Sequence, residues 1–125
     1  MASRDVRTAR VVFEDHLRIT KEGSVEEDLA RNYAANLVVL TGRGLFHGHD
    51  GLRQLADVLR RELPNCTFTY RTQLVEGDVA FLEWTARADG ARVDDGADSY
   101  VIRDGRIMAQ TIHYTVTPEP PKAGR

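Results

Sequence analysis

The sequence is short of everything that would tie a small fold together covalently or anchor it in a membrane. It has one cysteine, Cys66, among 125 residues, so an internal disulfide and a cysteine-cluster zinc site are both excluded. The longest apolar run, Leu37 to Leu40, is far too short to cross a bilayer. We therefore expect one domain that folds around an apolar core and has no membrane partner.

An excess of charge of one sign is also missing. The 17 Lys and Arg residues nearly balance the 19 Asp and Glu residues, and no long run of either sign occurs. A nucleic-acid-binding protein needs a basic stripe to displace counterions, so we expect no nucleic-acid partner. Residues 1–7 carry charge but no apolar segment follows them, so no signal peptide is predicted and we expect a cytoplasmic protein.

Helical periodicity is present throughout the first half of the chain. Ser24 and Glu27 form a capping box, which predicts a short second helix after a first helix that ends at Gly23. Asp50 is expected to cap a third helix, which ends at Pro64. The apolar residues that recur at helical spacing in the first helix are Val6, Ala9, Val12, Phe13, Leu17 and Ile19.

The period changes from 3.6 to 2 in the second half, which predicts four strands over residues 66–75, 79–88, 91–103 and 106–116. Short turns rich in Asp and Gly separate them and are typical of hairpins. Asp95 and Gly96, inside the third of these strands, predict a bulge. Helices followed by an antiparallel meander predict the α+β class, with one domain over residues 1–117 and a flexible proline-rich tail over 118–125.

Common catalytic and metal-binding motifs are not matched. The glycine-rich segment 42–48 follows a strand, but its third glycine is misplaced for a dinucleotide site. His47, His49 and Asp50 resemble a fragment of a metal site without a third ligand at a familiar spacing. The other two histidines would join it only if the fold brought them close. We therefore expect no metal and no cofactor.

Three polar residues fall where the periodicity calls for apolar ones. His16 lies on the apolar arc of the first helix, and Gln110 interrupts an apolar face of the last strand. Asp98 shares a strand face with Tyr100 and Ile102. Burial of a carboxyl group is unfavourable unless it is paired, hydrogen-bonded or protonated. Asp98 is thus either a satisfied structural group or a functional acid, and His16 is either a core histidine or a pocket residue.

The same faces supply candidate walls of a ligand pocket. Strand 79–88 leaves an alternative open, because both of its faces carry apolar residues: either Glu83 or Trp84 points into the cavity. The candidate pocket residues are Tyr33, Tyr70, Glu83, Trp84, Tyr100, Gln110, Ile112 and Tyr114.

Four segments, taken in order, carry a resemblance to a known family. They are the long first helix up to Gly23, residues 33–40, residues 44–53 and residues 100–107. Together they resemble the nuclear transport factor 2-like superfamily, in its SnoaL-like and ketosteroid-isomerase-like branch. The resemblance implies a cone, in which a curved, mostly antiparallel sheet wraps around three N-terminal helices and opens to an apolar pocket. It also implies a homodimer formed through the outer face of the sheet.

The functional residues of that branch are matched only in part. In ketosteroid isomerases a tyrosine of the first helix and a protonated aspartic acid of the third long strand form the oxyanion hole. The resemblance places His16 and Asp98 at about these positions. The general-base aspartate falls near Thr41, and the catalytic aspartate of SnoaL-like cyclases falls at Ile112. Neither residue is a base, so a steroid isomerase or a standard cyclase is not predicted unless Glu83 or His16 takes that role.

Two classes of function follow from these residues. The first is a cofactor-independent isomerase, cyclase or dehydratase that acts by proton transfer on a small apolar carbonyl or hydroxyl compound. In it His16 and Asp98 are the catalytic residues and Gln110 is a polar anchor. The second is a non-catalytic module that binds a small ligand or only dimerises.

Overall fold

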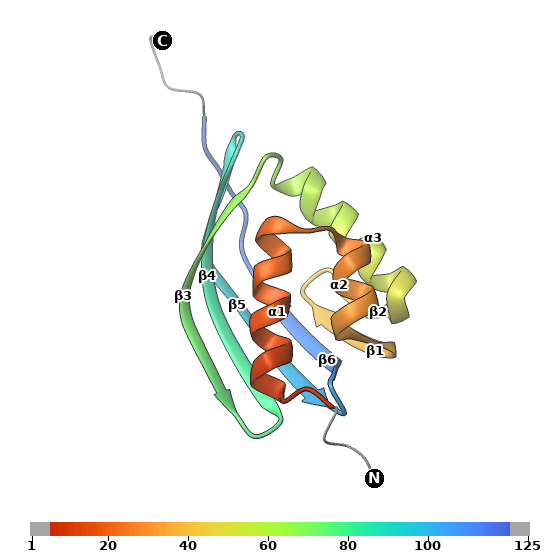
Figure 1. Ribbon diagram of the computed structural model, residues 1–125. Coiled ribbons are helices and arrows are strands. Elements are labelled where there is room, and N and C mark those ends of the chain that lie inside the picture. The colour runs from red at the N-terminus through yellow and green to blue at the C-terminus, as the bar shows by residue number, and fades with distance from the viewer. Residues whose placement is uncertain (1–5, 121–125) are drawn as a thin grey trace.

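Figure 1 shows the structure, a computed structural model that describes residues 6–120. The helices are α1 (Ala9–Glu22), α2 (Val25–Asn32) and α3 (Gly48–Glu62). The strands are β1 (Tyr33–Thr41), β2 (Gly44–His47), β3 (Thr67–Glu76), β4 (Val79–Ala88), β5 (Ala91–Arg103), β6 (Arg106–His113) and β7 (Thr117–Pro118). The predicted α+β class is confirmed, and the strands of the second half lie close to their predicted bounds. Within residues 6–120 no helix combines the length and apolar character needed to span a membrane.

The strands form one curved sheet in the order β2-β1-β6-β5-β4-β3, with β7 paired to β5. All pairs are antiparallel except β1 with β6. The long strands β3 to β6 curve around α1, and α2 and α3 lie on the other side of α1 (Figure 1). Contacts of α1 with β3, β4, β5 and β6 place this helix on the concave face. The predicted cone is therefore confirmed.

The first helix buries one apolar stripe against the sheet, formed by Val12, Phe13, His16, Leu17 and Ile19. The helix starts at Ala9 because the side chain of Thr8 accepts a hydrogen bond from the Val11 amide and caps it. Val6, which was predicted to belong to the stripe, precedes the cap and is exposed. His16 is thus part of the buried stripe, as its spacing predicted.

The caps of the other two helices differ in how well they were predicted. The Ser24 hydroxyl accepts the Glu27 amide at the start of α2, as the capping box predicted. The prediction that Asp50 caps α3 is wrong, because the helix already begins at Gly48 and Asp50 lies in its first turn. The Asp50 carboxylate instead accepts a hydrogen bond from Arg53 at 2.6 Å.

A bulge in β5 gives Trp84 its position. Trp84 pairs with Gly96 and Ala86 pairs with Val93, so two residues of β5 face the single residue Thr85, as predicted for a bulge. A Cβ atom added to Gly96 would lie 2.2 Å from the Trp84 ring. The indole therefore lies directly on the Gly96 backbone, which leaves no room for a side chain there.

The end of the chain and the inner face of β6 differ from the sequence interpretation. Thr117–Pro118 pairs with Arg92 and Ala91, so the tail predicted over 118–125 begins in a paired strand, while residues 121–125 lie outside the described part. On β6 the buried residues are Ile107, Gln110 and Ile112, so the alternation expected of a strand is interrupted between Ile107 and Gln110. A register shift between β5 and β6 causes this change of face.

Replacing Gly96 by alanine is expected to destabilise the protein by about 1–3 kcal/mol, since the new methyl group displaces the Trp84 indole. Urea unfolding measures the change, and tryptophan fluorescence reports the altered environment of the only tryptophan. Gly42→Ala is the matched control, because a Cβ at Gly42 meets nothing within 4 Å. Equal stability of the two variants would show that the Gly96 contact is not needed.

Candidate functional site

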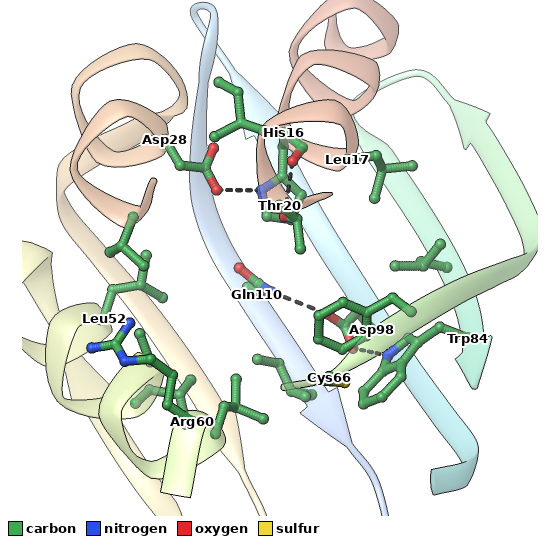
Figure 2. A pocket seen from close by; sticks show the side chains of 18 of the residues that line it. His16, Leu17, Thr20, Asp28, Leu52, Arg60, Cys66, Trp84, Asp98 and Gln110 are labelled. Atoms are coloured by element: carbon green, nitrogen blue, oxygen red, sulfur yellow. Dashed lines mark hydrogen bonds and ion pairs between the residues drawn. The ribbon is translucent and has the colours of Figure 1, made fainter. Parts of the chain in front are cut away.

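The helices and the concave face of the sheet enclose a cavity of about 690 Å³ (Figure 2). Most of its walls are apolar. The apolar lining residues include Leu17, Ile19, Val25, Leu52, Leu55, Leu59, Leu63, Phe68, Leu82 and Ile112. The exposed lining residues Gly23, Ser24, Arg60 and Asn65 mark a mouth between the α1–α2 turn and the end of α3. One part of the wall is polar, and it is formed around Asp98.

The carboxyl group of Asp98 is the centre of the polar part of the cavity. Its Oδ1 accepts a hydrogen bond from Trp84 Nε1 at 2.8 Å, and its Oδ2 accepts from Gln110 Nε2 at 3.1 Å and from the Tyr100 hydroxyl at 3.0 Å. Figure 2 shows the Trp84 and Gln110 side chains pointing at it. Burial raises the pKa of Asp98, and the three donors and the nearby His16 oppose that rise.

The imidazole of His16 lies between the Asp28 carboxyl group of α2 and the Tyr100 hydroxyl group of β5. Its Nδ1 is 2.7 Å from Asp28 Oδ2, an interaction drawn in Figure 2. Its Nε2 is 3.1 Å from the Tyr100 hydroxyl, which in turn donates to Asp98. Helix α1 thus joins α2 to β5 through one buried side chain.

The two buried tyrosines of this network remain phenols. Burial raises the pKa of both Tyr33 and Tyr100 well above 10, the ordinary value for a tyrosine. Tyr33 donates a hydrogen bond of 2.6 Å to Gln110 Oε1, which fixes the amide so that its nitrogen faces Asp98. Neutral phenols are hydrogen-bond donors at the pH of a cell, which suits them to hold a carboxylate or a carbonyl oxygen.

Sequence reasoning missed Asp28 and Asn32, which extend the network along α2. Asn32 Nδ2 donates to Asp28 Oδ1 at 2.8 Å and to Asp15 Oδ2 at 3.0 Å. A signal for both was present, because positions 25, 28, 29 and 32 have the spacing of one helix face, and Val25 and Leu29 are apolar. The role of Asp28 was overlooked because an acidic residue in the first turn of a helix is already explained by its favourable interaction with the helix dipole.

The network reaches the surface at Asp15. Hydrogen bonds from Arg31 above all, and also from Arg18 and Asn32, hold the pKa of the Asp15 carboxyl well below its usual range. Arg31 Nε is 2.8 Å from Asp15 Oδ2. The outer end of the network is therefore a fixed negative charge paired with arginine, and only its inner end meets the cavity.

The structure brings most of the predicted site residues to the cavity wall. His16, Asp98, Tyr33, Tyr70, Trp84, Tyr100, Gln110 and Ile112 all line it. Tyr70 stands apart from the polar network, because its hydroxyl donates to the Leu17 carbonyl oxygen at 2.8 Å.

Two predicted pocket residues lie elsewhere. Glu83 is exposed and accepts a hydrogen bond from the Thr72 hydroxyl, so it is Trp84, on the opposite face of β4, that points into the cavity. Tyr114 is buried but does not line the cavity; its hydroxyl donates to Glu62 at 2.5 Å. It follows the last residue of β6, His113, so the alternation of that strand no longer determines its direction.

The two positions at which the resembled enzymes carry their catalytic bases, Thr41 and Ile112, supply no base in this structure. Thr41 lies outside the cavity, and its hydroxyl donates to the Gly44 carbonyl oxygen. Ile112 lies on the cavity wall next to Asp98 in β5, and presents an apolar side chain there. Neither position supplies a base, and the exposed Glu83 cannot replace one. Of the candidates named from the sequence, only His16 is left at the cavity.

The histidine-rich segment at the start of α3 has a structural contact. His49 Nε2 lies 3.1 Å from the Tyr33 carbonyl oxygen, which ties α3 to the start of β1. In the described part of the chain, no three His, Cys, Asp or Glu side chains are grouped so that they could hold a metal ion.

The buried polar side chains in the described part of the chain are all hydrogen-bonded. Among residues 6–120, no buried side-chain nitrogen or oxygen lacks a hydrogen bond. The network is therefore complete without a ligand, and a polar ligand group has to use an acceptor position that remains open or displace an existing bond.

Comparisons with known proteins agree on the fold and on the family. The sequence profile described as SnoaL-like domain matches residues 11–110. The comparison with curated proteins gave no match.

Solved structures with the same fold were found at low sequence identity. A candidate ketosteroid isomerase from Kribbella flavida DSM 17836 is 18% identical, with a TM-score of 0.73 over 98% of this chain and 88% of that one. A candidate isomerase of the SnoaL-like family from Agrobacterium tumefaciens str. C58 is 18% identical, with a TM-score of 0.67 over 86% of this chain and 97% of the other. A candidate SnoaL-like polyketide cyclase from Mesorhizobium loti is also 18% identical, with a TM-score of 0.63 over 86% of this chain and all of that one.

The raised pKa of Asp98 predicts a pH dependence of stability. A carboxyl whose pKa is higher in the folded than in the unfolded state adds stability below its unfolded pKa, and that stability is lost as the pH rises through the folded pKa. The unfolding free energy of the wild type, minus that of Asp98→Asn, should therefore decrease as the pH rises from 3.5 to 7. Urea unfolding at several pH values measures it.

Asp104→Asn is the control for this titration, because Asp104 is exposed in a turn at φ 53°, a conformation that asparagine also adopts. A difference that increases with pH for Asp98→Asn would contradict the raised pKa.

Proposed function

The chain belongs to the SnoaL-like domain family, and from this premise we propose that it binds a small, largely apolar carbonyl or hydroxyl compound and acts on it by cofactor-independent proton transfer. The observation that supports the proposal is the buried Asp98 carboxyl, which three donors hold on the wall of an otherwise apolar cavity. Isomerisation, cyclisation and dehydration are the reaction types that such a site suits.

The cavity has the size and character of a small-molecule site. Ligand pockets in proteins measure about 300–1,000 Å³ and are lined mostly by apolar side chains with a few placed polar groups. This cavity, of about 690 Å³, falls inside that range. A small apolar ligand would fit inside it, with its polar atoms turned toward Asp98 and Gln110.

The proposed roles of the residues follow from their surroundings. In its neutral form Asp98 is a hydrogen-bond donor for a carbonyl or enolate oxygen, as in the isomerases that the sequence resembles. Gln110, held by Tyr33, anchors the carboxyl and the ligand. His16 serves as the base, because Thr41 and Ile112 do not offer one.

The alternative is a binding module without catalysis, and one observation favours it. Every buried polar atom of the network already has a partner, which is the condition expected of a structural network. The two functions differ in whether a product forms. A binding module only has to hold its ligand, whereas an enzyme also has to convert it.

A screen followed by mutagenesis tests the proposal. Apolar ketones, lactones and steroids are tested for stabilisation in thermal unfolding, and each stabilising compound is then incubated with the protein and analysed for product. Asp98→Asn and His16→Ala should each lower turnover by about 10²-fold, since general acid–base groups contribute at least this much. Glu83→Gln, on the exposed face of β4, is the control and should keep full activity.

The outcomes separate the two functions. Stabilisation without any product would favour the binding module, and full activity of both Asp98→Asn and His16→Ala would contradict the assigned roles.

We also propose a homodimer through the outer face of the sheet. Four apolar residues pair across four strands there and form a continuous row: Val79, Val101, Ala109 and Val38. Val79 is 54% exposed and the other three are half-buried in the single chain. A second copy of the chain packed on this row would remove these apolar side chains from water.

The expectations of a cytoplasmic location and of no nucleic-acid partner remain predictions from the sequence.

Val101→Glu should convert the dimer to a monomer, because it places a charge in the middle of the row. Sedimentation velocity at several protein concentrations measures the change. Thr69→Glu, on the edge strand β3, adds the same charge outside the row and should leave the dimer intact. A monomeric wild-type protein would exclude the proposed interface.

A further inference from the structure

Both ring nitrogens of His16 are already engaged, and this raises the question of how the histidine acts on a ligand. Nδ1 lies 2.7 Å from Asp28 and Nε2 lies 3.1 Å from the Tyr100 hydroxyl. A ligand cannot take either nitrogen without breaking one of these bonds. We infer that His16 acts on the ligand from a distance, through a proton relay formed by Tyr100 and Asp98. This inference rests on the proposed proton-transfer function.

A count of hydrogens supports the relay. The Tyr100 hydroxyl has one hydrogen but two neighbours, His16 Nε2 and Asp98 Oδ2, at 3.1 and 3.0 Å. If Tyr100 donates to Asp98, then His16 Nε2 must donate to Tyr100, and with Nδ1 donating to the Asp28 carboxylate the group holds an imidazolium and the Asp98 carboxylate. If Asp98 is protonated and donates to Tyr100, then Tyr100 donates to a neutral His16. Both arrangements contain the same number of protons and use the same heavy-atom positions.

Asp98 has an open position through which the ligand can reach this relay. A carboxyl group offers about four acceptor positions, and Trp84, Tyr100 and Gln110 occupy three of those on Asp98. Oδ2 has two of these contacts, whereas Oδ1 has only the one with Trp84. The remaining position on Oδ1 is therefore the place where a ligand proton can be accepted or returned.

The relay transfers one proton from the ligand to His16 in a balanced step. The ligand gives its proton to Asp98 Oδ1, the proton on Asp98 Oδ2 moves to the Tyr100 oxygen, and the Tyr100 proton moves to His16 Nε2. The ligand is left with one negative charge and His16 gains one positive charge, while Tyr100 and Asp98 end as neutral as they began. The reverse sequence returns the proton to a different atom of the ligand, as an isomerisation requires.

The surroundings of His16 suit it to hold the proton. Asp28 on α2 faces Nδ1 and stabilises the imidazolium. The other titratable groups near it are Asp98 and Tyr100 on β5 and Tyr33 on β1, whose ring is 5.7 Å away, while Tyr70 on β3 lines the same cavity. Tyr100, the middle member of the relay, is only 1% exposed and therefore has little contact with bulk water.

The relay can be tested in the free protein by NMR, which keeps it separate from the question of turnover. A proton shared between His16 and Asp98 gives intermediate shifts for the His16 Nε2 nitrogen and the Asp98 carboxyl carbon. Both should change between H₂O and D₂O, since deuterium alters the sharing. Tyr100→Phe removes the middle of the relay and should move both signals to the values of fixed protonation states.

Tyr70→Phe is the matched control. It also removes a phenol hydroxyl from the cavity wall, but that hydroxyl bonds to the Leu17 carbonyl oxygen and lies outside the relay. This variant should leave the His16 and Asp98 signals as they are in the wild type. Shifts that already correspond to fixed protonation states in the wild-type protein, without an isotope response, would overturn the inference even if Tyr100→Phe does not fold.

Turnover gives a second readout once a substrate is found. Tyr100→Phe should lower kcat by about 10²-fold and leave KM nearly unchanged. An increase in KM with kcat unchanged would show that Tyr100 only shapes the cavity. If no compound binds or turns over, the proposed function fails while the NMR result for the relay stands by itself.

Discussion

The burial of one carboxyl group in an apolar cavity is the constraint on which much of this structure depends. An unpaired carboxylate at the position of Asp98 would be unfavourable by several kcal/mol, so the fold has to supply partners. Trp84, Tyr100 and Gln110 do so from three neighbouring strands. The indole reaches Asp98 because Gly96 has no side chain, and the bulge in β5 sets that contact. The bulge in β5 and the glycine at position 96 thus both serve the bond between Trp84 and the buried carboxyl group.

The same constraint connects the sheet to the helices. Tyr100 bonds to His16 as well as to Asp98, and His16 continues to Asp28. Asn32 then joins Asp28 to Asp15, where arginine side chains face solvent. Polar groups of this kind in a core are stable only when all are satisfied, and within residues 6–120 they are. The network thereby fixes the position of α1 relative to β5, which in turn fixes the shape of the cavity.

The sequence predicted the parts of this arrangement that follow from periodicity. His16, Asp98 and Gln110 stood out because each interrupts an apolar face, and all three lie on the cavity wall. Other parts of the site were harder to predict from the sequence. Asp28 lies on a helix of only 8 residues, where an acid near the start has a local explanation, and its partner His16 is on another element.

The choice between Glu83 and Trp84 required the pairing with Gly96, because both faces of β4 carry apolar residues. Tyr114 was misplaced since β6 ends at His113, one residue before it. The proposed base, His16, lies on helix α1 rather than on a strand, and this also affects which compounds the cavity suits. With Thr41 outside the cavity and Ile112 apolar, the strands contribute no charged side chain to the cavity wall other than Asp98. Such a site favours a compound that gives up and regains a single proton near one oxygen, and it disfavours one that needs a separate base on the opposite face.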